Sequence, residues 1–192
     1  MNTLEAAGPI VILGHGASGT AASMRPWVEA LAARGLTSRA IDLPRGRAER
    51  AVPVFEQAIA ASGGGAIAGG HSFGGRVASL AVANRLESGE AGVAGLLLLS
   101  YPLHRPGKPE LWPDRTAWWP RLRLPVLLLS GEADPFARLD LLRQAVGQLP
   151  VAELVTYPRV GHGLGPVLDE AADRAARFIR AVTAGGLQAS SR

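Results

Sequence analysis

The stretch IAGGHSFGGRVASLAVANRL, residues 67–86, decides the fold of this 192-residue chain. A short apolar run ends in two glycines, and apolar residues such as Val77 and Leu80 then recur at helical spacing. A strand that turns sharply into a helix at a G-x-S-x-G motif is typical of a nucleophile elbow, here with Ser72 at the apex. The flanking positions are glycines because side chains there would clash with the adjoining backbone.

Ser72 has a second interpretation, because serine is also favoured as the N-cap of a helix. On the catalytic interpretation, the Ser72 hydroxyl is a nucleophile, and the amide of Phe73 at the helix N-terminus faces developing negative charge. The turn by itself does not choose between the two. A serine nucleophile also needs a base and an orienting carboxylate, each at the carboxyl end of a later strand.

Two later turns supply both groups. Asp134 lies in GEADPF, directly after the apolar run PVLLLS, and His162 lies in RVGHGLG, after LVTYP. The chain order Ser, Asp, His is the one found in proteins with a nucleophile elbow. Either residue alone is more commonly an ordinary loop residue, but their joint occurrence after successive strands favours a catalytic set. We therefore predict Ser72 as nucleophile, His162 as base and Asp134 as its partner.

Short apolar runs alternate with longer segments of helical period, which is typical of an α/β fold with helices on both faces of a parallel sheet. The predicted strands are 9–14, 38–43, 65–70, 93–100, 125–130 and 152–158. Right-handed crossovers would place the first strand between the second and third, with the others following outward. We expect one domain over residues 1–192, with residues 185–192 as a disordered tail.

A second glycine-rich turn, GHGASGT, suggests a competing function. It matches the dinucleotide-binding motif G-x-G-x-x-G through Gly14, Gly16 and Gly19, and Asp42 lies near the offset expected for a ribose contact. A short-chain dehydrogenase would also need a tyrosine with a lysine four residues on, and neither tyrosine here has one. An NAD(P)-binding protein is therefore the least favoured hypothesis.

Composition narrows the remaining classes. The chain has no cysteine and only four scattered histidines, so we expect no metal site. Its 20 basic and 16 acidic residues are interspersed, which gives little support for nucleic-acid binding. The opening MNTLEAAGPIVILG has no basic leader and too short an apolar run for a signal peptide or a membrane span. We expect a cytoplasmic protein without a cofactor or a membrane partner, and no oligomeric state is indicated.

The motifs GHGASGT, GGHSFGGR, LSYPLHRPGKPE, LLLSGEADPFA and GHGL resemble the small alpha/beta-hydrolases distantly related to dienelactone hydrolase. That branch also includes a subunit of the nuclear non-specific lethal complex, and the resemblance covers residues 9–182. It implies a minimal six-stranded alpha/beta-hydrolase fold without a cofactor. The site residues that it implies are a catalytic triad of Ser72, Asp134 and His162 and an oxyanion hole from the amides of Phe73 and Ala17. A dienelactone hydrolase would have cysteine as the nucleophile instead of serine.

On this resemblance the GHGASGT turn supplies an amide to the oxyanion, and Asp42 becomes a structural residue that hydrogen-bonds amides of the turn LPRGR. His15 and His71 are expected to pack beside the site without acting as bases. The proline-rich connection 101–125 is too short for a lid domain, and its tryptophans are expected to pack over the sheet.

The predicted function is a carboxylesterase-like serine hydrolase that cleaves a small ester, thioester or lactone through an acyl-enzyme. The alternative from another class is a non-catalytic interaction module on the same scaffold. An intact set of three catalytic residue types argues against that alternative, since a scaffold does not need them.

Overall fold

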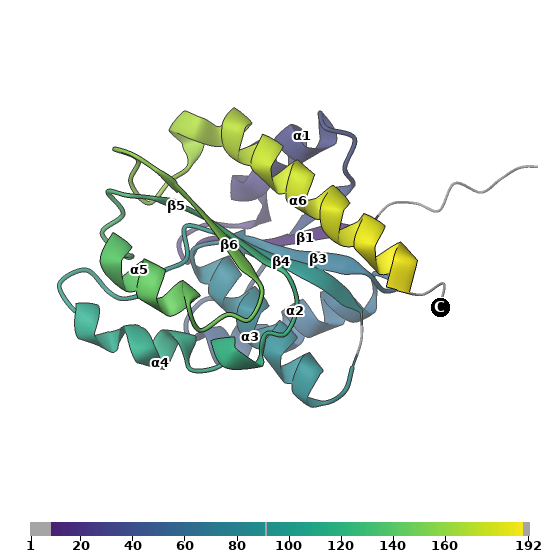
Figure 1. Ribbon diagram of the computed structural model, residues 1–192, viewed down its shortest axis with the longest axis horizontal. Coiled ribbons are helices and arrows are strands. Elements are labelled where there is room, and N and C mark those ends of the chain that lie inside the picture. The colour runs from purple at the N-terminus through teal and green to yellow at the C-terminus, as the bar shows by residue number, and fades with distance from the viewer. Residues whose placement is uncertain (1–8, 91, 190–192) are drawn as a thin grey trace, which may run out of the picture.

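The computed structural model describes residues 9–90 and 92–189, and its centre is one six-stranded parallel sheet (Figure 1). The strands are β1 (Val11–Gly14), β2 (Ser38–Ile41), β3 (Ala66–His71), β4 (Val93–Leu99), β5 (Val126–Gly131) and β6 (Ala152–Tyr157). Their order is β2-β1-β3-β4-β5-β6, and each neighbouring pair is parallel. The predicted strands, their order and the α/β class are confirmed.

The central strands are apolar along most of their length because helices cover both faces of the sheet. In β1 the side chains of Val11, Ile12 and Leu13 are completely buried. The edge strand β6, by contrast, begins with the exposed residues Ala152 and Glu153. The apolar core therefore lies on both sides of the central strands.

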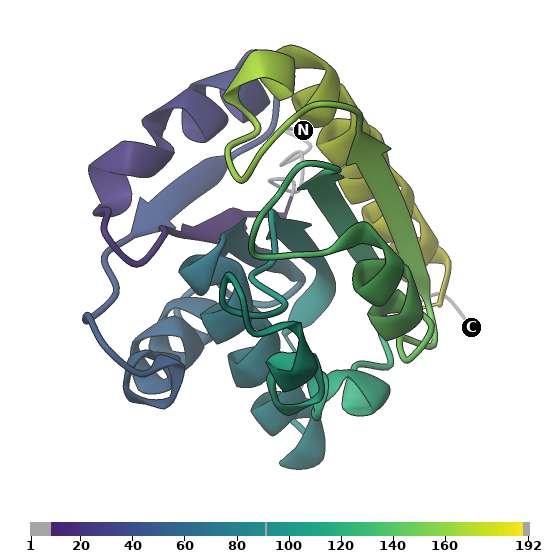
Figure 2. The same cartoon turned by 90° about the vertical axis from the view of Figure 1, so that its left-hand side faces the viewer.

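Two layers of helices form these covers (Figure 1). One face of the sheet carries α1 (Arg25–Ala32) and α6 (Leu168–Ala189). The other carries α2 (Ala48–Ala60), α3 (Phe73–Glu87) and α5 (Leu139–Val146). Figure 2 looks onto the edge of the sheet where the loops that follow the strands gather. Across the described residues, no helix combines the length and the hydropathy needed to cross a membrane.

The connection between β4 and β5 holds one short α-helix, α4 (Trp112–Thr116), flanked by two 3-10 helices, and no lid domain. Trp118 and Trp119 are buried, and the Trp119 ring meets the Tyr101 ring edge-on with centroids 4.9 Å apart. These two tryptophans pack into the core, as predicted. The remaining short elements are the 3-10 helices η1 (Ala21–Met24), η2 (Pro109–Leu111), η3 (Trp119–Arg121) and η4 (Gly165–Val167).

The C-terminal end differs from the prediction. Helix α6 continues to Ala189, which lies inside the segment 185–192 that was expected to be a disordered tail. The physical reason is helix propensity, because Leu187, Gln188 and Ala189 are strong helix formers and offset the low propensity of Gly185 and Gly186. Residues 190–192 lie outside the described residues.

Three glycines bring β1, β3 and α3 into direct backbone contact. A Cβ atom on Gly74 would lie 2.1 Å from the carbonyl oxygen of Gly14, and one on Gly70 would lie 2.3 Å from the same oxygen. Gly70 also has a φ of +152°, which L side chains rarely adopt. The backbone that excludes side chains from the elbow is therefore the end of β1, and the two glycine-rich turns pack against each other.

This contact predicts a strong and local cost of adding one methyl group. Gly74→Ala should lower the free energy of unfolding by about 3 kcal/mol or more, because the backbone of Gly14 cannot move away without disturbing the sheet. Gly185→Ala is the matched control, since Gly185 is exposed on α6 with no heavy atom near the new Cβ. It should raise stability by about 0.5 kcal/mol. Urea denaturation measures both, and equal effects would contradict the proposed contact.

Candidate active site

Ser72 occupies a strained turn between β3 and α3. Its backbone has φ 51° and ψ −116°, a conformation that is uncommon for a residue with a side chain. The Ser72 amide donates a 2.8 Å hydrogen bond to the carbonyl of Leu99 at the end of β4. The Ser72 carbonyl accepts a 3.1 Å bond from the amide of Arg76 in α3. Strand, turn and helix together hold this serine at the carboxyl edge of the sheet.

The three predicted side chains meet although they are far apart in sequence. Ser72 Oγ lies 2.8 Å from Nε2 of His162, within reach to donate its proton to that nitrogen. On the other side of the ring, Nδ1–H of His162 donates a 2.8 Å hydrogen bond to Oδ2 of Asp134. The carboxylate therefore fixes the tautomer in which Nε2 is free to accept the serine proton.

The Asp134 carboxylate is fully buried, and each of its two oxygens accepts a hydrogen bond. Its Oδ1 accepts a 2.8 Å hydrogen bond from the backbone amide of Phe136, while Oδ2 accepts the bond from His162. The loop after β5 also bonds to the loop after β6, since the amide of Ala133 donates to the carbonyl of Val160 at 2.9 Å. Both loops are thereby fixed relative to each other.

Two rings hold the His162 side chain in place. The Phe136 ring lies against it with centroids 4.5 Å apart, and the His71 ring lies 5.1 Å away. His71 Nε2–H also donates a 3.0 Å hydrogen bond to the His162 carbonyl. Burial lowers the pKa of His71, although this hydrogen bond opposes the shift. His71 therefore supports the histidine loop as a neutral ring, in keeping with the packing role predicted for it.

The first glycine turn is fixed by His15. Its Nδ1–H donates to the Gly16 carbonyl at 2.7 Å, and its Nε2 accepts a 2.9 Å bond from the amide of Leu43. The prediction for Asp42 was wrong in its partner: the carboxylate accepts a 2.7 Å bond from the amide of Ala21, outside the turn LPRGR. The two turns after β1 and β2 lie side by side, so Asp42 reaches across to η1 instead of closing its own turn.

The two residues predicted to supply the oxyanion hole, Phe73 and Ala17, border the same cavity as Ser72. Phe73 is the first residue of α3, and Ala17 follows β1 in the turn held by His15. Their role as oxyanion donors stays a prediction. Within residues 9–90 and 92–189, no cluster of three or more His, Asp or Glu side chains is placed to hold a metal ion.

Two cavities with different linings border Ser72. The apolar pocket, of about 550 Å³, is bordered by Ser72 and His162 and walled by side chains of α1, η1, η4 and α6 that include Met24, Pro26, Trp27, Leu164 and Leu168. The cationic pocket, of about 530 Å³, is bordered by Ser72 and Phe73 and contains Arg47, Arg76, Arg105 and Arg115. His162 borders the first pocket and is not among the residues that line the second.

Sequence inspection missed two features of this site. Phe136, which both binds Asp134 and packs on His162, follows Asp134 in the sequence DPF, and an Asp–Pro turn is a signal that could have indicated it. The four arginines of the cationic pocket come from three separate segments, so no local sequence pattern predicts that they meet.

The order of the sheet, the elbow after β3 and the polar residues after β5 and β6 define an alpha/beta-hydrolase fold. The chain matches the family described as an alpha/beta hydrolase domain over residues 7–184. It therefore belongs to the alpha/beta hydrolase family.

Solved structures show the same fold at low sequence identity. The chain is similar to a monoacylglycerol lipase from Paleococcus ferrophilus, with a TM-score of 0.78 at 17% identity over 91% of this chain and 96% of that one. Est1E from Butyrivibrio proteoclasticus gives 0.76 at 17% identity, over 92% and 89%. A dienelactone hydrolase from Anabaena variabilis gives 0.70 at 24% identity, over 92% and 87%.

The lowered pKa of His71 predicts how stability responds to acid. The unfolded chain protonates His71 as the pH falls through its ordinary pKa of 6.5, whereas the folded chain does not. The free energy of unfolding should therefore decrease as the pH drops below that value. In His71→Gln, which keeps a donor for the His162 carbonyl but cannot titrate, urea denaturation at pH 7.5 and pH 5.0 should show a smaller loss. An equal loss in both proteins would contradict this role of His71.

Proposed function

We propose that this protein is a serine hydrolase that cleaves a small ester, thioester or lactone through an acyl-enzyme. The observation that supports it most directly is the pair of 2.8 Å hydrogen bonds joining Ser72 to His162 and His162 to Asp134. A buried carboxylate, an oriented imidazole and a hydroxyl on a strained turn are the parts that nucleophilic acyl transfer requires.

In the first half-reaction, Ser72 Oγ attacks the carbonyl carbon of the substrate while His162 Nε2 takes the hydroxyl proton. The carbonyl oxygen becomes an oxyanion, which the amides of Phe73 and Ala17 would stabilise. Asp134 stabilises the imidazolium without itself taking the proton. The carbon–oxygen bond to the alcohol then breaks, and His162 returns the proton to the departing oxygen.

In the second half-reaction, water replaces the alcohol. His162 Nε2 takes a proton from the water as its oxygen attacks the acyl-serine, and a second oxyanion forms in the same place. When this intermediate collapses, the bond to Ser72 Oγ breaks and His162 gives the proton back to that oxygen. The acid product leaves, and the site returns to its starting protonation state.

The residues that border the two pockets support an assignment of the two halves of the substrate. His162 must protonate the departing alcohol, so the alcohol lies on the side that His162 borders, which is the apolar pocket. The acyl group then lies on the other side of Ser72. The names of similar structures, a monoacylglycerol lipase and a dienelactone hydrolase among them, support an ester or lactone as the substrate class.

The catalytic roles predict the effects of three substitutions. Ser72→Ala and His162→Ala should each lower kcat/KM on 4-nitrophenyl acetate at least about a thousandfold with the fold intact, and Asp134→Asn on the order of a hundredfold or more. A fluorophosphonate probe should label the wild type stoichiometrically and leave Ser72→Ala unlabelled. Ser62→Ala is the control, because Ser62 follows α2 and bonds only to the Ile59 carbonyl. Full activity in Ser72→Ala would show that another group is the nucleophile.

The acyl side of the site also predicts a preference for short chains. Four arginines line the acyl side and no lid domain covers it, so each added acyl methylene gains little of the roughly 0.8 kcal/mol that burying a CH₂ provides. Across 4-nitrophenyl acetate, butyrate, octanoate and palmitate, kcat/KM should therefore fall or level off. A steady rise to palmitate, or a jump in rate when micelles form, would show that the connection between β4 and β5 covers a long lipid chain.

The same experiments test the alternative of a non-catalytic interaction module, which predicts neither labelling nor turnover. The narrower relation to the branch with a non-specific lethal complex subunit stays a prediction, as does the cytoplasmic location.

A further inference from the structure

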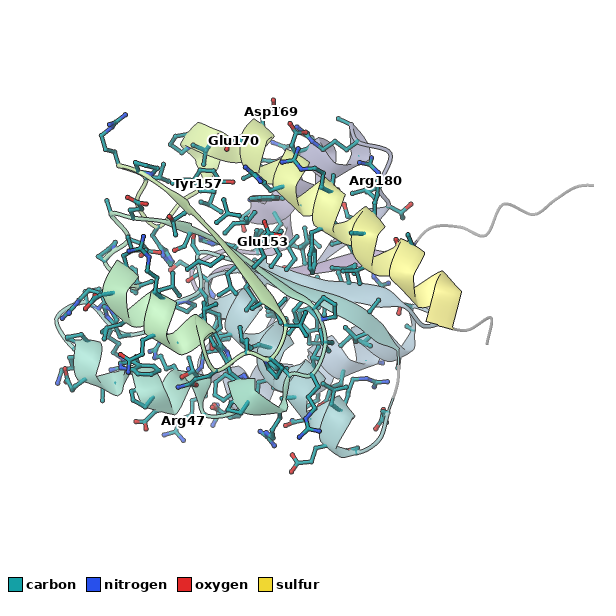
Figure 3. All side chains as sticks on the ribbon, in the orientation of Figure 1. Arg47, Glu153, Tyr157, Asp169, Glu170 and Arg180 are labelled. Carbon is teal, nitrogen blue, oxygen red and sulfur yellow. The ribbon has the colours of Figure 1, made fainter. Side chains whose placement is uncertain are left out.

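The cationic pocket carries an excess of positive charge beside the nucleophile. Four arginines line it, Arg47, Arg76, Arg105 and Arg115, against one carboxylate, that of Glu49. They come from the loop between β2 and α2, from α3, and from the connection between β4 and β5. Figure 3, in which Arg47 is labelled, shows this residue on the side of the sheet where α4 carries Arg115. Segments far apart in sequence thus direct like charges into one cavity.

Few of these charges are neutralised within the protein. Arg76 lies 3.4 Å from Glu49, an ion pair whose carboxylate is mostly exposed. Arg115 Nη1 donates a 2.9 Å hydrogen bond to the Pro102 carbonyl. A carbonyl group is polar but uncharged, so it does not neutralise the guanidinium. Among the described residues, no carboxylate forms an ion pair with Arg47, Arg105 or Arg115.

Arg76 is held in position and is still incompletely bonded. Its guanidinium carbon lies 5.7 Å from the centre of the Trp118 ring, and the Trp118 indole N–H is itself fixed by a 3.0 Å bond to Ser79 Oγ. The Nε atom of Arg76 is buried without a hydrogen-bond partner among the described residues. The Trp118 ring thus fixes the guanidinium at the wall of the cationic pocket.

The arginines also raise one another's electrostatic energy. The pKa of Arg115 is lowered, first by burial and then by the positive charges of Arg76 and Arg105. Such mutual repulsion is unfavourable in the free protein, and an anion bound among the three would relieve it. The planar N–H donors of a guanidinium group match the oxygens of a carboxylate or a phosphate, and a carboxylate is the anion that an acyl chain ordinarily carries.

We propose that the cationic pocket binds a carboxylate on the acyl half of the substrate, so that the preferred substrates are monoesters of dicarboxylic acids. The neighbouring Ser72 and Phe73 would hold the scissile carbonyl, and the arginines the distant acid group. The apolar pocket, next to His162, takes an uncharged alcohol. This subsite requires the hydrolase activity proposed above, since it acts on the acyl group of that reaction.

Matched substrates that differ only in charge test the subsite. Monohexyl glutarate carries a carboxylate on the acyl half, and hexyl glutaramate carries an uncharged amide of nearly the same shape. Release of hexanol, followed by gas chromatography, gives kcat/KM for each. In the wild type the acid should be preferred about tenfold or more, as is typical of hydrogen bonds between charged groups, and the preference should shrink with added salt.

Substitutions that are expected to lower or to raise the acid-to-amide ratio of kcat/KM test the subsite further. Arg76→Gln and Arg105→Gln should each reduce the acid-to-amide ratio of kcat/KM about tenfold, mainly through KM for the acid. Glu49→Gln removes the competing carboxylate and should increase the ratio. Arg123→Gln is the matched control, because Arg123 is exposed outside both pockets and its loss changes the net charge equally. If Arg76→Gln does not fold, Arg105→Gln tests the same point at an exposed position.

The outcomes separate this subsite from the underlying activity. Ser72-dependent cleavage of both esters at equal rates would overturn the subsite and leave the hydrolase function standing. If the acid-to-amide ratio falls equally in Arg123→Gln, the preference comes from net charge alone, and the subsite is overturned. A preference confined to an anion on the alcohol half, measured with 4-acetoxybenzoate against 4-acetoxybenzamide, would overturn the assignment to the acyl half. Cleavage of neither ester would overturn the subsite, and it would overturn the hydrolase function as well only if 4-nitrophenyl acetate is not cleaved either.

Discussion

The backbone contact between the end of β1 and the elbow after β3 is the constraint on which the site depends. Because Gly14, Gly70 and Gly74 have no side chains, the first turn of α3 lies directly against β1. This close approach places Ser72 at the apex of a strained turn, and it places Ala17 beside it. One contact thus positions both the proposed nucleophile and the two residues whose amides are proposed to stabilise the oxyanion. Side chains at these positions would push the layers apart and separate those groups.

A second close approach does the same for the other half of the site. A Cβ on Gly131 would lie 2.1 Å from the Val160 carbonyl, so the end of β5 fits tightly against the loop that carries His162. The bond from the Ala133 amide to that carbonyl closes the contact. Asp134 and His162 therefore meet because two loops are bonded through their backbones, and their side chains add the last link. Such a backbone frame limits the reorganisation needed during the reaction.

The two pockets, and not the fold, are the features that bear on the choice of substrate. Fold likeness to a lipase and to a dienelactone hydrolase carries no substrate by itself, since one fold hosts many reactions. The walls around Ser72 carry that information, apolar on the side of His162 and rich in arginine on the other. In the connection between β4 and β5, Trp118 and Trp119 are buried instead of forming an exposed cover, and Trp118 supports one of the arginines.

The sequence by itself determined the six strands and their order, and it predicted that Ser72, Asp134 and His162 lie together, because periodicity, turn chemistry and the order of motifs can be read along the chain. It did not determine the partner of Asp42, which reaches Ala21 across two neighbouring turns. Nor did it indicate the four arginines of the cationic pocket, which looked like dispersed charges along the chain. Only the tertiary structure brings such residues together, since their proximity follows from how distant loops pack and leaves no pattern in any one segment.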